Sequence, residues 1–142
     1  MIIYFDTSAL IKLFVEESGA TIARDAAERA EFVATSMLAY AEARAAFARK
    51  RRFGEITADL LERVKKEFES TWEGLQIVAI DESTVRRAGG FAETYSLKGF
   101  DAVHLASADA LRQNFGPITF GCFDADLSRA ASSCGMMLLP SA

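Results

Sequence analysis

The strongest chemical signal in this sequence is a set of four acidic residues, Asp6, Glu42, Asp101 and Asp124. Asp6 ends an apolar, strand-like run, and Asp124 follows a second run of the same kind. Glu42 lies inside an alanine-rich helical stretch, and Asp101 begins another. In an open α/β sheet the strand ends share one edge, where ligands bind. Carboxylates gathered there without basic partners repel one another unless a divalent cation neutralises them. The pattern therefore predicts a metal-dependent enzyme that acts on phosphate chemistry.

Each of these acids also has a structural interpretation. Asp6 and Asp101 stand at expected helix starts, where aspartate commonly caps the helix. Glu42 has small apolar residues three and four positions away, which argues against a simply solvated side chain, although an exposed position on a weakly patterned helix stays possible. Asp126 competes with Asp124 for the last position. The end of the strand is the better-placed site, so we favour Asp124.

Three further polar residues lie near these acids in the sequence. Ser8 could touch a metal ion, or a water bound to it, through its hydroxyl group. His104 is the only histidine; we place it on a different helix face from Asp101 and assign it a structural role. Asp109 lies about 12 Å beyond Asp101 by helical rise, which is too far to share an ion, so we interpret it as a helix-face residue.

Short apolar runs alternate with longer helical patterns along the chain. The expected strands are residues 2–5, 32–35, 76–80, 118–123 and 136–139. The expected helices are residues 8–15, 18–30, 37–52, 56–72, 82–95, 101–114 and 125–133, with N-caps at Ser36, Thr57 and Asp81. Short runs that are apolar on both faces suit a parallel sheet covered by helices on both sides. We therefore predict an α/β fold, a three-layer α/β/α sandwich with a central parallel sheet, formed by residues 1–142 as a single domain.

Composition excludes several classes of protein. Hydrophobic residues make up 51% of the 142 residues and charged residues 25%, as in a folded globular domain rather than a disordered chain. No apolar run approaches the roughly 20 residues that span a bilayer. The N-terminus lacks the pattern of a signal peptide, so we expect a cytoplasmic protein without membrane contact. The two cysteines lack metal-site spacing, which makes a zinc site improbable.

The basic residues are concentrated in one segment, although the net charge is −4. Residues 44–66 contain eight basic and three acidic side chains, a local charge of +5. Solvated helix faces are one explanation, and a patch that faces phosphate or an acidic partner is the other. If the patch faces phosphate, we expect the contacts to come from Lys12, Arg44, Arg49, Lys50, Arg51 and Arg52.

Taken in order, the motifs resemble those of PIN-domain ribonucleases, and most closely the VapC toxins of bacterial and archaeal toxin–antitoxin pairs. The motifs are residues 5–10, the helix around Glu42, residues 99–106 and residues 123–127, and residues 135–140 resemble the family's last strand. The resemblance covers essentially the whole chain. It implies an α/β/α sandwich, Mg²⁺- or Mn²⁺-dependent endoribonuclease activity, a homodimer, and a small VapB-like antitoxin whose tail covers the active site.

On this interpretation one or two divalent ions are held by four acids, Asp6, Glu42, Asp101 and Asp124. The enzyme cuts RNA, and the RNA contacts the six basic residues named above. The ion lowers the pKa of a water molecule, which attacks phosphorus and leaves a 5′-phosphate and a 3′-hydroxyl. A PIN-like module that binds RNA or protein with little turnover is the main alternative. A receiver-like phosphoacceptor, with Asp81 as the acceptor, is a third hypothesis, although it lacks the acidic pair expected after the first strand.

Overall fold

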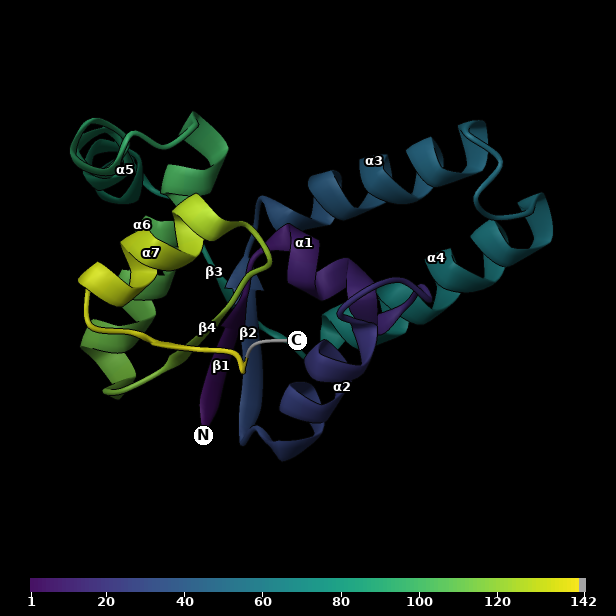
Figure 1. Cartoon of the computed structure of the whole chain (residues 1–142), viewed down its shortest axis with the longest axis horizontal. Coiled ribbons are helices and arrows are strands. Elements are labelled where there is room, and N and C mark those ends of the chain that lie inside the picture. The colour runs from purple at the N-terminus through teal and green to yellow at the C-terminus, as the bar shows by residue number, and fades with distance from the viewer. Residues whose placement is uncertain (141–142) are drawn as a thin grey trace.

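The computed structural model describes residues 1–140, which form a five-stranded parallel sheet between two layers of helices (Figure 1). The strands are β1 (Ile2–Phe5), β2 (Phe32–Ser36), β3 (Gln76–Val78), β4 (Thr119–Gly121) and β5 (Met137–Leu138). Their spatial order is β3-β2-β1-β4-β5, and every neighbouring pair is parallel. The predicted α/β/α sandwich is confirmed.

The helices lie close to their predicted positions. They are α1 (Thr7–Leu10), the 3₁₀ helix η1 (Ile11–Leu13), α2 (Ala20–Arg29), α3 (Ala39–Arg52), α4 (Ala58–Glu73), α5 (Glu82–Tyr95), α6 (Gly99–Phe115) and α7 (Ala125–Ser133). Thr57 and Asp81 cap α4 and α5 as predicted. The predicted cap at Ser36 is wrong, because α3 begins after Leu38; the Ser36 hydroxyl instead accepts a hydrogen bond from the Leu38 N–H.

The two helical layers follow from the alternation of side chains along β1. Ile3 and Phe5 belong to the core formed with α1, α2, α3 and α4, whereas Tyr4 belongs to the core formed with α6 and α7. Successive residues of a strand face opposite sides of the sheet, so a continuous apolar run supplies both cores at once. Helix α5 packs on α6 through a seam of small residues, Ala88, Ala102 and Ala106.

A cluster of aromatic rings braces α3 and α4 against the rest of the domain. Phe68 of α4 is fully buried and lies 5.6 Å from Phe47 of α3 and 5.5 Å from Phe14, between ring centroids. Tyr40 and Trp72 pack against the same ring at 5.5 Å and 5.6 Å. The first turn of α3 carries Glu42, so this cluster sets the position of that carboxylate.

The topology places a crevice between the carboxyl ends of β1 and β4. The chain runs outward from β1 to β3 on one side, and then crosses β1 to build β4 and β5 on the other side. Such a reversal of strand order is where open α/β sheets bind ligands. The two strands approach closely there: Gly121 pairs with Phe5, whose ring occupies the space of a Cβ, and the Asp6 N–H donates to the Gly121 carbonyl at 3.0 Å.

Across residues 1–140, no helix combines the length and the apolar character that crossing a lipid bilayer requires.

Candidate active site

A hollow of about 330 Å³ opens at the carboxyl ends of β1 and β4. It is lined by Asp6, Thr7, Ser8, Glu42, Asp101, His104, Phe123 and Asp124. All four acids singled out in the sequence therefore meet here, and the lining contains neither lysine nor arginine. A larger cleft, of about 470 Å³, lies between η1, α2, α3 and α4, but its acids face basic partners such as Lys50 and Arg24. We take the smaller hollow as the candidate active site because its carboxylates are not neutralised.

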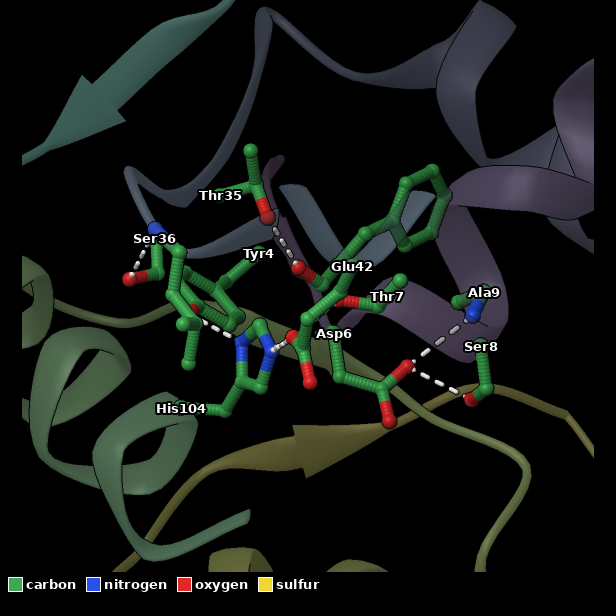
Figure 2. Close-up of polar contacts among 11 residues, drawn as sticks. Tyr4, Asp6, Thr7, Ser8, Ala9, Thr35, Ser36, Glu42 and His104 are labelled. Atoms are coloured by element: carbon green, nitrogen blue, oxygen red, sulfur yellow. Dashed lines mark hydrogen bonds and ion pairs between the residues drawn. The ribbon is translucent and has the colours of Figure 1, made fainter. Parts of the chain in front are cut away.

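Asp6 and Asp124 are helix caps and also line the hollow. Asp6 Oδ1 accepts hydrogen bonds from the Ala9 N–H at 2.9 Å and the Ser8 hydroxyl at 2.7 Å (Figure 2). Asp124 Oδ2 accepts from the Leu127 N–H at 2.9 Å. The capping bonds use one oxygen of each carboxylate and fix its orientation. The structural and the chemical interpretation of these acids are thus compatible, and the Ser8 hydroxyl orients Asp6.

Glu42 enters the hollow from the first turn of α3. Its Oε1 accepts a hydrogen bond from the Thr7 hydroxyl at 2.5 Å and lies 2.8 Å from Nε2 of His104 (Figure 2). Burial alone would raise the pKa of Glu42, but the hydrogen bonds from His104 and Thr7 outweigh it and lower the pKa below its ordinary value. Glu42 is therefore ionised at neutral pH.

His104 and Thr7 are the two polar residues lining the hollow that the sequence analysis did not assign to the site. The assignment of His104 to a different helix face from Asp101 is wrong, because residues three apart in an α-helix lie on the same side. Its imidazole is only 2% exposed. The three-residue spacing from Asp101 was the signal that could have identified it. Thr7 follows Asp6 directly, and that adjacency was its only sequence signal.

The pKa of Asp101 is raised by burial and by the combined negative charge of the site. It lies in the first turn of α6, whose N-cap is Lys98, so the helix begins two residues earlier than predicted. Burial raises the pKa of Asp101, and the negative charges of Asp124, Asp6 and Glu42 raise it further. A like-charged cluster that resists ionisation is a favourable environment for a hard cation with oxygen ligands. The donor set therefore fits Mg²⁺ or Mn²⁺.

The competing acids lie outside the hollow. Asp126 pairs with Arg129, and its side chain is 68% exposed. Asp109 is buried rather than on a solvated helix face: it forms ion pairs with Arg87 of α5 and with Arg112, the latter at 2.8 Å. Asp81 caps α5 through the Thr84 N–H and does not line the hollow. Of the acids that the sequence left as alternatives, Asp124 is the one placed in the site.

Three of the four carboxylates, those of Asp6, Glu42 and Asp124, accept hydrogen bonds from groups of the protein. Within residues 1–140, no three His, Cys, Asp or Glu side chains are placed closely enough to hold an ion as they stand. Glu42 is turned toward Thr7 and His104, and one oxygen of Asp6 is turned toward Ser8. Whether these four acids bind metal stays a prediction.

We expect Asp101→Asn to stabilise the metal-free protein at neutral pH. Because the pKa of Asp101 is raised in the folded state, its favourable contribution is present below its ordinary value of 3.8 and is lost as pH rises through the raised pKa. The variant has no charge at this position, so it lacks this loss of stability. The helix dipole acts in the opposite direction, because it favours a negative charge in a first turn. Urea denaturation in EDTA across pH should show a difference from wild type that is small in acid and grows toward neutrality. A difference independent of pH would contradict the mutual repulsion.

The basic residues divide into two groups. Lys12 and Lys50 both pair with Glu17, at 2.9 Å and 3.1 Å, and Lys12 also lies 4.7 Å from the centroid of the Phe123 ring. Lys12 is buried by these contacts, so its charge is already compensated by protein.

The second group lies along α3 beyond Glu42. Arg49, Arg51 and Arg52 are exposed, and Arg44 is half-buried beside Glu69. In Figure 1 this helix runs outward from the sheet; Glu42 lies in its first turn, and Arg49, Arg51 and Arg52 lie in its last turn. Their placement is compatible with a surface that follows a long polyanion, and contact with RNA stays a prediction.

Comparisons with known proteins agree with this geometry. The family model described as PIN domain matches residues 3–132. Ribonuclease VapC45 of Mycobacterium tuberculosis (strain CDC 1551 / Oshkosh) is 32% identical over 139 residues, which cover 98% of this chain and 95% of that protein.

Two solved structures share the fold. A toxin–antitoxin complex from Klebsiella pneumoniae aligns with a TM-score of 0.62 and 20% identity, over 85% of each chain. VapC20 of Mycobacterium tuberculosis, described as a sarcin–ricin loop cleaving toxin, aligns with a TM-score of 0.64 and 18% identity, over 90% of this chain and 94% of its own.

Proposed function

Since this chain belongs to the PIN-domain family, we propose that it is a divalent-metal-dependent endoribonuclease and the toxin of a toxin–antitoxin pair. The proposal covers residues 1–142 as a single PIN-like domain. The observation that carries it is the gathering of four carboxylates, from four separate elements, in one hollow that neither lysine nor arginine lines. The ribonuclease name of the VapC45 relative supports the reaction class.

We propose that Asp6, Glu42, Asp101 and Asp124 hold the cation, which is Mg²⁺ or Mn²⁺. When bound, the cation would lower the pKa of a water molecule and offset charge on the attacked phosphate. The protein keeps the Asp6 and Asp124 carboxylates oriented through their capping bonds, and keeps Glu42 ionised through Thr7 and His104. Attack of water on phosphorus then breaks the bond to the 3′ oxygen, which leaves a 5′-phosphate and a 3′-hydroxyl.

We propose that the RNA backbone runs from the hollow along α3. The phosphate contacts fall on Arg44, Arg49, Arg51 and Arg52, because these side chains follow Glu42 on the same helix. Lys12 and Lys50 both pair with Glu17, which compensates part of their positive charge. They therefore attract RNA only through the charge that remains, and not as two free ammonium groups. The dependence of RNA affinity on salt concentration measures how many such contacts form.

We propose a small VapB-like antitoxin as the protein partner, and a homodimer as the assembly of the toxin. The antitoxin is supported by the structural likeness to a toxin–antitoxin complex from Klebsiella pneumoniae. The acidic hollow and the basic last turn of α3 are separate surfaces of opposite charge. A partner that covers both therefore needs basic groups in one segment and acidic groups in another.

The test is cleavage of RNA by purified protein with Mg²⁺, with Mn²⁺, and with EDTA. We expect cleavage in either ion, 5′-phosphate and 3′-hydroxyl ends on the products, and loss of cleavage in EDTA that excess Mg²⁺ restores. Cleavage that persists in EDTA would contradict the metal assignment. Tight RNA binding without cleavage in either ion would favour the alternative, a catalytically weak PIN-like module that binds RNA or protein.

A further inference from the structure

A line of buried hydrogen bonds connects the central strand to the candidate active site. The Tyr4 hydroxyl lies 2.7 Å from Nδ1 of His104, and Nε2 of the same ring lies 2.8 Å from Oε1 of Glu42 (Figure 2). Tyr4 is fully buried, and His104 is nearly so. The line therefore joins a residue of β1, a residue of α6 and a residue of α3, and only its Glu42 end is partly exposed.

We propose that Tyr4 and His104 are positioning residues for Glu42: the Tyr4 hydroxyl holds the imidazole ring through Nδ1, and the N–H at Nε2 of the same ring orients the Glu42 carboxylate. The role of the oriented carboxylate rests on the proposed function. The arrangement of the protons does not, because it concerns groups of the protein alone.

The contact with Glu42 places a hydrogen on Nε2. An ionised carboxylate has only acceptor oxygens, so the 2.8 Å contact needs a hydrogen on that nitrogen. Thr7 donates to the same oxygen at 2.5 Å, so both bonds end on Oε1 and hold the carboxylate in one orientation.

Tyr4 holds the other end of the imidazole. Its hydroxyl is the group that lies 2.7 Å from Nδ1, and both side chains are buried. The phenol ring is stacked on Phe120 with centroids 5.5 Å apart and sits in the middle strand of the sheet, which makes it a rigid reference point.

The presence of a single histidine gives this inference a direct spectroscopic test. Nitrogen-15 NMR of the imidazole distinguishes the two neutral tautomers and the cation, which ordinary structures do not. In metal-free wild-type protein we expect a hydrogen on Nε2. In Tyr4→Phe we expect a shift of the Nδ1 resonance, because the ring loses the hydroxyl that holds it. A wild-type ring without a hydrogen on Nε2, or a Tyr4→Phe ring that is unchanged, would overturn the proposal.

A second measurement follows the consequence for Glu42. The amide nitrogen of Gln occupies a position similar to Nε2, so His104→Gln keeps a donor, whereas His104→Leu removes it. We expect the Mn²⁺ affinity of His104→Leu to fall by about 10–100-fold, as when groups behind metal ligands are lost, and that of His104→Gln to fall by much less. Calorimetric titration of Mn²⁺ measures this without RNA, and circular dichroism checks that both variants fold.

A failure of the proposed function and a failure of this inference give different experimental results. If wild-type protein binds no Mn²⁺ and cuts no RNA, the proposed function fails, and the NMR result still decides the protonation of His104. If wild type binds Mn²⁺ and folded His104→Leu binds it equally well, Glu42 needs no positioning by His104 and this inference is wrong.

Discussion

Asp6→Asn is expected to reduce RNA cleavage by about 10²–10³-fold, the loss typical of removing one preorganised electrostatic group from an active site. The substitution removes the negative charge at the central position of the hollow, between β1 and β4. It keeps the side-chain oxygen that accepts from the Ala9 N–H. Asn caps helices about as well as Asp, so the free energy of unfolding should change by less than about 1 kcal/mol. The measurement is kcat for a defined RNA, beside the urea midpoint of the same preparation.

Asp81→Asn is the matched control for this substitution. Asp81 caps α5 through the Thr84 N–H at 2.8 Å, with the same side-chain geometry as Asp6, but it is exposed and lies outside the hollow. It is also the residue that a receiver-like phosphoacceptor would use. We expect full cleavage activity from this variant. Equal loss of activity in both variants would mean that the effect does not depend on a position in the hollow, and wild-type activity in Asp6→Asn would remove Asp6 from the reaction.

Phe68→Ala is expected to lower the free energy of unfolding by about 3–5 kcal/mol, the usual result of truncating a buried aromatic side chain. Phe68 is fully buried and contacts the rings of Phe14 and Phe47, so its loss leaves a cavity where α4 braces α3. Cleavage should fall as well, because α3 carries Glu42 into the hollow. Urea denaturation of the purified variant measures the change in stability.

Phe53→Ala is the control on the same pair of helices. Its ring follows the last turn of α3, is 67% exposed and packs mainly against Arg49. Truncating an exposed side chain usually changes stability by no more than about 0.5 kcal/mol. Similar destabilisation by both substitutions would show that the aromatic cluster is not the brace that the packing indicates.

Most of the fold could be predicted from local patterns. The strand at residues 2–5 and the helices at residues 82–95 and 125–133 have the predicted boundaries, because apolar periodicity and capping residues act over a few positions. The start of α6 was misplaced by two residues. Asp101 resembles a cap in sequence, whereas Lys98 holds that position in the structure and Asp101 lies in the first turn.

The site was predictable only in part, because its hydrogen bonds join residues far apart in sequence. The four acids could be proposed from their positions after strands and in helices. The hydrogen bonds of Glu42 with Thr7 and His104 could not be predicted, because Thr7 lies 35 residues and His104 lies 62 residues from Glu42 in the sequence. The surroundings of Lys12 could not be predicted either. From its place near the first motif we expected it to contact RNA, whereas in the structure it is buried and paired with Glu17.

The sequence by itself determined the order of strands and helices, the class of fold and the four acids that could take part in chemistry. These follow from the periodicity and type of neighbouring residues, which act through local backbone geometry. The tertiary structure alone decided which acid of the Asp124 and Asp126 pair faces the hollow, that the strand order reverses beside β1, and that Tyr4 reaches His104 across 100 residues. These depend on which surfaces the packed layers bring together, and a linear pattern carries no information on distances between separate elements.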